Sequence, residues 1–129
     1  MKFLSALVFV FISIHSFGQG MDCSAFKNGK FEIIEKDLEN SIIVRNGDVQ
    51  IEYGEYSQLK IELKVTWIDE CNYTLELIQV LENPKDIIIS DGMILYVEII
   101  ETKANSYVQR TRSNINDYVS TSELFKIEE

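Results

Sequence analysis

The sequence predicts an all-β protein, an antiparallel meander of seven or eight strands that forms a small barrel or half-barrel. Residues 58–67 alternate without a break between polar and apolar side chains, which gives a strand one polar and one apolar face. Short apolar segments recur along the chain and are separated by turn-forming pairs such as Asn46-Gly47 and Asp91-Gly92. No segment shows the sustained periodicity of a long helix. A β-sandwich built from the same strands is the alternative.

Two short strands follow the turn signal Asn28-Gly29. Residues 30–33 alternate until Ile34 breaks the pattern, and residues 41–45 form a run rich in β-branched side chains. Asn46-Gly47 then fits a type I′ hairpin turn, because both residues tolerate the positive φ that this turn requires.

The strand after this turn, residues 48–53, also alternates. We expect its apolar side chains to face the core and its polar side chains to face solvent. Val49, Ile51 and Tyr53 are predicted to point inward, and Asp48, Gln50 and Glu52 outward.

Residues 58–67 and 73–80 are predicted to pair as the central hairpin of the meander. The alternation slips between Leu77 and Ile78, and a β-bulge at that point would restore the register. The inner face of the first arm is formed by Leu59, Ile61, Leu63, Val65 and Trp67.

The remaining residues predict further strands. Residues 87–89 and 106–112 form short candidates. Residues 93–100 are apolar on both faces, and such a strand needs cover on both sides, from the carboxyl-terminal segment, a partner or a ligand. Residues 113–129 fit either a short helix or a closing edge strand over 124–127, and we favour the strand.

The first 19 residues have the features of a signal peptide. Lys2 provides a positive start, residues 3–14 are apolar, and Ser16-Phe17-Gly18 offers a cleavage site. The apolar run is shorter than the roughly 20 residues that span a bilayer. We therefore predict a signal peptide over 1–19 and a single secreted or periplasmic β domain over 20–129, with no membrane span after cleavage. An uncleaved anchor, a buried helix and acylation of Cys23 are the alternatives.

Cleavage would remove the sole histidine, His15, and this limits the chemistry available. Catalytic Ser-His and Cys-His pairs and histidine-containing zinc sites would be excluded. The net charge of −9 argues against nucleic-acid binding, because phosphate recognition requires a basic surface. The sequence also lacks a Gly-rich phosphate loop and a metal-ligand motif. We predict no cofactor, no metal site and no enzymatic activity.

The two cysteines, Cys23 and Cys71, predict a disulfide, because an even number of cysteines in an exported protein is usually paired. Free thiols or a redox site are the alternatives. Such a bond would close a long loop and contribute on the order of 4 kcal/mol to stability.

Two groups of side chains are candidates for binding. Arg110 and Arg112 share a strand face and would either bind an anion or pair with nearby acidic residues. Alternating aromatic residues would either form ordinary core or line a ligand pocket. The residues of this possible pocket are Phe31, Tyr53, Trp67, Tyr73 and Tyr96.

Two motifs, Cys23-x-x-Phe26-x-x-Gly29-x-Phe31 and Trp67-Ile68-x-x-Cys71-x-Tyr73, resemble those of uncharacterised small secreted proteins of Bacteroidetes-type bacteria. The resemblance implies an exported β domain and no particular activity. The meander also loosely resembles lipocalin-type barrels, although Gly29-Lys30-Phe31 replaces the Gly-x-Trp opening of that family.

These observations favour an exported, non-enzymatic β-barrel that binds a small apolar ligand in its interior. The alternative is a protein-interaction or envelope-associated structural module that uses the apolar strand over 93–100.

Overall fold

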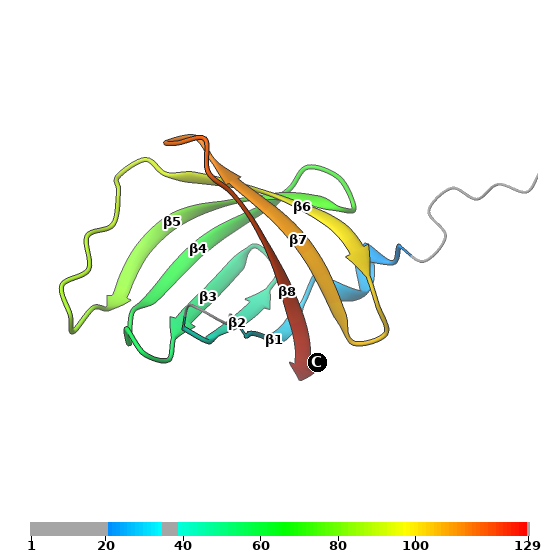
Figure 1. Ribbon diagram of the computed structural model, residues 1–129, viewed down its shortest axis with the longest axis horizontal. Coiled ribbons are helices and arrows are strands. Elements are labelled where there is room, and N and C mark those ends of the chain that lie inside the picture. The colour runs from blue at the N-terminus through cyan, green and yellow to red at the C-terminus, as the bar shows by residue number, and fades with distance from the viewer. Residues whose placement is uncertain (1–20, 35–38, 129) are drawn as a thin grey trace, which may run out of the picture.

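The computed structural model describes residues 21–34 and 39–128, in which eight antiparallel strands close into a barrel (Figure 1). The strands are β1 (Gly29–Ile33), β2 (Ser41–Asn46), β3 (Val49–Gly54), β4 (Lys60–Trp67), β5 (Asn72–Glu82), β6 (Ile94–Thr102), β7 (Ser106–Ser113) and β8 (Val119–Glu128). Each strand pairs with the next in sequence, and β8 returns to pair with β1. The predicted antiparallel barrel is therefore confirmed and fully closed, so its strands leave no unpaired edge.

A turn of 3₁₀ helix, η1 (Cys23–Phe26), precedes β1 and packs at one end of the barrel. Cys23 is bonded to Cys71 in the β4–β5 turn, with 5.3 Å between their Cα atoms, which confirms the predicted disulfide. The backbone N–H of Asp22 also donates to Thr102 Oγ1 at 2.8 Å. These contacts hold the segment before β1 against the β4–β5 turn and the end of β6, both far away in the sequence. In the described part of the chain, no helix has the length and apolar character needed to cross a membrane. The predicted signal peptide over 1–19 lies outside the described residues.

The central hairpin has the predicted bulge. Leu63 pairs with Leu77 and Glu62 pairs with Gln79, so Ile78 is the extra residue on β5. The inward orientation predicted for β4 is also confirmed, because Leu63 and Val65 belong to the buried core.

Two local predictions, the type I′ turn at Asn46-Gly47 and the strand over 87–89, are wrong. Asn46 pairs with Val49, so the β2–β3 turn is formed by Gly47-Asp48, and among these residues only Gly47 has positive φ, at 64°. The turn is therefore not type I′, which needs positive φ at both central residues. Residues 87–89 form no strand and belong to the β5–β6 loop.

The carboxyl-terminal segment is a strand, as favoured over a helix, and it is longer than predicted. β8 begins at Val119 and pairs along most of its length with β7 and β1. These long-range backbone pairs complete the barrel, whereas the helical spacing noted in this segment has no partner that would stabilise a short helix.

The predicted orientation of β3 is wrong, because its polar face, not its apolar face, points into the barrel. Gln50 pairs with the core residue Leu63 and is only 1% exposed, and Glu52 pairs with Ile61. Because cross-strand partners share a face, Gln50 and Glu52 point into the barrel. Val49, Ile51 and Tyr53 therefore lie on its outer surface, where Ile51 and Tyr53 line a shallow apolar groove with Ile42 and Val44. The physical reason is a buried arginine on β2 that requires polar partners inside.

The two ends of the barrel differ in their connections. Tight turns at residues 47–48, 68–71 and 103–105 lie at the end that η1 covers, which we call the turn end. The longer connections, including residues 55–59, 83–93 and 114–118, lie at the opposite end, which we call the loop end. In a meander, successive connections fall at opposite ends of the barrel. Because short and long connections alternate along this chain, the long ones gather at one end.

Candidate functional site

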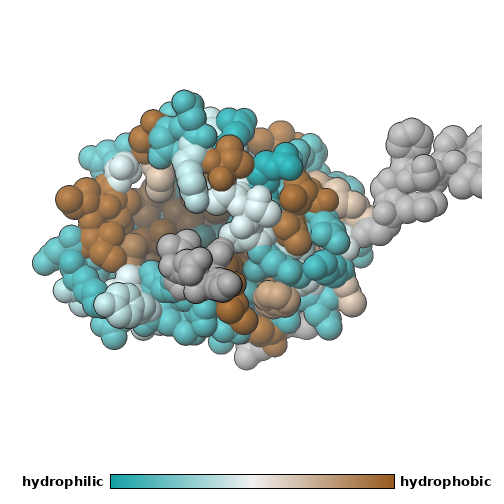
Figure 2. Space-filling model, viewed as in Figure 1, coloured by the Kyte–Doolittle hydropathy of each residue, from teal (hydrophilic) through white to brown (hydrophobic). Residues whose placement is uncertain are grey.

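The barrel is packed at the turn end and open at the loop end. On four strands, an inward side chain nearer the turns is buried, while the inward side chain two positions nearer the loops is partly exposed. These pairs are Phe31 and Ile33, Leu63 and Ile61, Leu75 and Leu77, and Val97 and Leu95. Figure 2 shows a hollow with apolar side chains inside it, on the same side of the view as the β5–β6 loop. The inner wall of the barrel is therefore accessible to solvent at this opening, which we call the mouth.

Polar groups gather on one side of the mouth. Ser41, Glu52 and Ile61 line a small pocket of about 110 Å³ there. The other residues of this pocket are Glu39, Gly54, Ser57 and Leu59. The mouth thus combines an apolar wall with a carboxylate, Glu52, that points inward from β3.

Behind this pocket, Arg45 on β2 is buried in the barrel and only 1% exposed. Its Nε donates to Gln50 Oε1 at 2.8 Å and its Nη1 donates to the Phe26 carbonyl at 2.8 Å. Its Nη2 donates to the hydroxyls of Tyr73 and Tyr107, at 3.0 and 2.8 Å. All three guanidinium nitrogens are therefore engaged, as a buried charge requires.

Aromatic rings surround the same guanidinium. Its central carbon lies 4.7 Å from the ring centre of Tyr73 and 5.2 Å from that of Phe31, distances suited to cation–π attraction. Burial alone would lower the pKa of Arg45, but the phenolic oxygens of Tyr73 and Tyr107 outweigh this effect and raise it. Arg45 therefore remains charged and joins β2, η1, β5 and β7 in one network.

Glu52 is linked to this network through Gln50, whose Nε2 donates to Glu52 Oε1 at 2.7 Å. Burial inside the barrel raises the pKa of Glu52, although the hydrogen bond from Gln50 and the charge of Arg45 act in the opposite direction. Glu52 lies two residues beyond Gln50 toward the loop end, so it stands between Arg45 and the mouth.

At the rim of the mouth, Glu39 links the segment before β2 to the β3–β4 connection. Its Oε1 accepts hydrogen bonds from the backbone N–H groups of Tyr56 and Ser57, at 3.0 and 2.8 Å. The adjacent Asn40 carbonyl accepts a hydrogen bond from the N–H of Glu55 at 3.0 Å. Desolvation opposes ionisation of Glu39, but the hydrogen bonds from Ser57 and Tyr56 and the charge of Lys85 outweigh it and lower its pKa.

This contact predicts a pH-dependent change at the rim. A carboxyl group whose pKa is lowered by folding stabilises the fold above its unfolded pKa, and this contribution is lost as the pH falls through the folded value. We expect the amide proton signals of Tyr56 and Ser57 in NMR spectra to titrate with a midpoint below 4.5, the ordinary value for this carboxyl group. The Glu39→Gln variant should lose this titration. A midpoint above 4.5 would contradict the assignment.

The five predicted pocket aromatics fall into two groups. Phe31 and Tyr73 are buried in the packed turn end, and Trp67 lies against Tyr73 with 4.6 Å between ring centres. Tyr53 and Tyr96 lie on the outer surface. The structure thus brings three of the five together around Arg45, on the far side of the network from the mouth.

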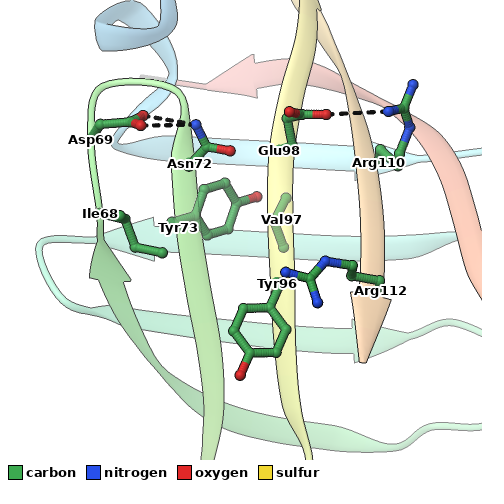
Figure 3. Close-up of a pocket in the computed structure, with 9 residues that line it drawn as sticks. All are labelled: Ile68, Asp69, Asn72, Tyr73, Tyr96, Val97, Glu98, Arg110 and Arg112. Atoms are coloured by element: carbon green, nitrogen blue, oxygen red, sulfur yellow. Dashed lines mark hydrogen bonds and ion pairs between the residues drawn. The ribbon is translucent and has the colours of Figure 1, made fainter. Parts of the chain in front are cut away.

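A second hollow lies on the outer surface of β5, β6 and β7, with a volume of about 440 Å³ (Figure 3). Arg110 pairs with Glu98 at 3.4 Å, and the guanidinium of Arg112 lies 4.4 Å from the ring centre of Tyr96. Asn72 donates to both carboxylate oxygens of Asp69, at 2.9 and 3.0 Å. Arg110 therefore pairs with a carboxylate, which is one of the two alternatives anticipated, whereas Arg112 and Asp69 have uncharged partners.

The strand that the sequence shows to be apolar on both faces is β6. Leu95, Val97 and Ile99 face the core, whereas Ile94 and Tyr96 face outward. Arg112 on β7 covers part of Tyr96, so some of the cover on the outer face comes from the neighbouring strand.

No family model, curated protein or solved structure significantly matches this chain. Within residues 21–34 and 39–128, no group of three or more His, Cys, Asp or Glu side chains is arranged to hold a metal ion.

Proposed function

We propose that this protein is an exported binding module that holds a small apolar molecule in the mouth of the barrel. The observation that supports the proposal is the change from buried to exposed inward side chains toward the loop end. An apolar inner wall that is open to water gains free energy when an apolar ligand covers it. The disulfide is compatible with an oxidising compartment outside the cytoplasm.

The partly exposed inner residues Ile61, Leu77 and Leu95 would contact the apolar part of the ligand. The packed turn end would limit how deeply the ligand enters, because Arg45 and its aromatic neighbours fill the barrel there. Nothing in this arrangement requires a nucleophile, a metal or a cofactor.

The alternative, a protein-interaction or envelope-associated module built on β6, has weaker support. Half of the apolar side chains on this strand belong to the core, and Tyr96 on its outer face is partly covered by Arg112. An exposed, continuous apolar surface would favour that alternative.

A paired substitution on β6 tests the proposed site. Leu95 points into the mouth and its neighbour Ile94 points outward, so Leu95→Trp should fill the mouth while Ile94→Trp adds the same bulk outside. We expect an environment-sensitive hydrophobic dye to bind the native protein and Ile94→Trp with similar affinity. Its affinity for Leu95→Trp should fall by at least about tenfold, or 1.4 kcal/mol.

Thermal unfolding of both variants shows whether each remains folded. Equal dye binding by folded Leu95→Trp and Ile94→Trp, or no dye binding by the native protein, would contradict an interior binding site. If Leu95→Trp does not fold, Leu77→Phe provides a smaller obstruction on β5 for the same comparison.

A further inference from the structure

The mouth holds one feature that a purely apolar site would not need, the inward carboxylate of Glu52. It lines the small pocket with Ser41 and Ile61. Gln50 donates to one of its two oxygens, and no second hydrogen bond to this carboxylate is formed by the described residues. Glu52 therefore retains an acceptor oxygen at the place where a ligand would enter.

Arg45 cannot bind an anionic ligand that enters from the mouth. Its three nitrogens donate to groups of the protein, and it is sealed behind Gln50 at the packed end. An anionic group entering from the mouth would meet Glu52 first. Glu39, a second carboxylate, lines the same pocket.

We infer that the mouth selects ligands whose polar end is a cationic hydrogen-bond donor, of the class of long-chain amines, over ligands that end in a carboxylate. This inference rests on the proposed function, because it assigns the polar end of a ligand whose apolar part would cover the inner wall. An ammonium group could donate to Glu52, while Ile61 and Leu77 contact its hydrocarbon chain. A carboxylate at the same position would be repelled by Glu52 and would find no free guanidinium.

Three ligands of equal chain length distinguish these possibilities. Dodecylamine, dodecanol and dodecanoate are titrated by calorimetry into the native protein near neutral pH, each below the concentration at which it aggregates. We expect dodecylamine to bind at least about tenfold more tightly than dodecanoate, with dodecanol between them. Tighter binding of dodecanoate, or equal binding of all three, would overturn the inference and leave the proposed function standing. Binding of none of the three would overturn both.

The role of Glu52 is tested by a matched pair of variants. Glu52→Gln removes the charge inside the mouth, and Glu98→Gln removes a charge from the outer surface of β6. We expect Glu52→Gln to weaken dodecylamine binding by about tenfold while changing dodecanol binding by less than about twofold. Glu98→Gln should leave both affinities unchanged. An equal loss in the two variants would show only attraction of a cation to an acidic protein and would overturn the assignment of Glu52.

A measurement on the native protein covers the case in which Glu52→Gln does not fold. The ¹³C signal of the Glu52 side-chain carboxyl carbon should shift on addition of dodecylamine and remain in place on addition of dodecanol. An unchanged signal in saturating dodecylamine would overturn direct recognition by Glu52.

Discussion

Replacing Arg45 with methionine should lower the free energy of unfolding by about 3–5 kcal/mol, the cost typical of breaking a buried charged network by removing one partner. Methionine fills much of the volume but donates no hydrogen bond. The Phe26 carbonyl and Gln50 Oε1 would lose the guanidinium donors that they have in the native barrel. Each buried polar group left without a partner costs about 1–3 kcal/mol. Urea-induced unfolding, followed by fluorescence of Trp67, measures the change.

A matched control is available on the outer surface. Arg110 forms an exposed pair with Glu98, and Arg110→Met should change stability by no more than about 1 kcal/mol. A loss of less than about 1 kcal/mol for Arg45→Met would contradict a structural role for the buried network. Arg45→Lys should also destabilise the protein, because a lysine cannot reproduce three separately directed nitrogens.

The architecture follows from local patterns to a large extent. The alternation of residues 58–67 placed Leu63 and Val65 inside, and the slip after Leu77 located a bulge. These predictions are correct because β4 has one apolar face, and only that face can be buried at little cost. The closure of β8 onto β1 required long-range pairing, which a local pattern does not reveal.

The orientation of β3 shows the limit of this reasoning. Period-2 alternation separates two faces, but it does not state which one is inside. Here the polar face of β3 is inside because Gln50 lies opposite Arg45 and donates to Glu52. Arginine is normally exposed, and two of the side chains that stabilise Arg45 are 28 and 62 positions away in the sequence.

The site was therefore only partly predictable. A ligand site in the interior was expected, but its aromatic lining was expected at residues that the structure places at the packed end or outside. One sequence signal pointed to the mouth. Short turns such as Gly47-Asp48 alternate with long connections such as residues 83–93, and in a meander all the long connections fall at one end. The inward carboxylate of Glu52 had no comparable signal, because its orientation depends on Arg45.

Removing the disulfide should have an effect of similar size to Arg45→Met, through a different mechanism. The Cys23–Cys71 bond spans 48 positions, and a loop of this length contributes on the order of 4 kcal/mol by restricting the unfolded chain. Cys23 also begins η1, which positions the Phe26 carbonyl that accepts from Arg45 and the Phe26 ring that packs on Tyr107 with 5.2 Å between ring centres. We expect the Cys23→Ser, Cys71→Ser double variant to lose about 3–5 kcal/mol in urea unfolding.

Reduction of the native protein provides the control, because it breaks the same bond without changing any other residue. The reduced protein and the double variant should unfold at similar urea concentrations, both well below the oxidised protein.

If the bond acted only on the unfolded chain, amide hydrogen exchange of the folded barrel around Phe26 would be unchanged by reduction. We expect instead faster exchange at residues 24–31, because η1 is attached to the β4–β5 turn by this bond. A stability loss below about 1 kcal/mol would show that η1 packs at the turn end without the disulfide, held by its other contacts, such as the hydrogen bonds from Arg45 to the Phe26 carbonyl and from Asp22 to Thr102.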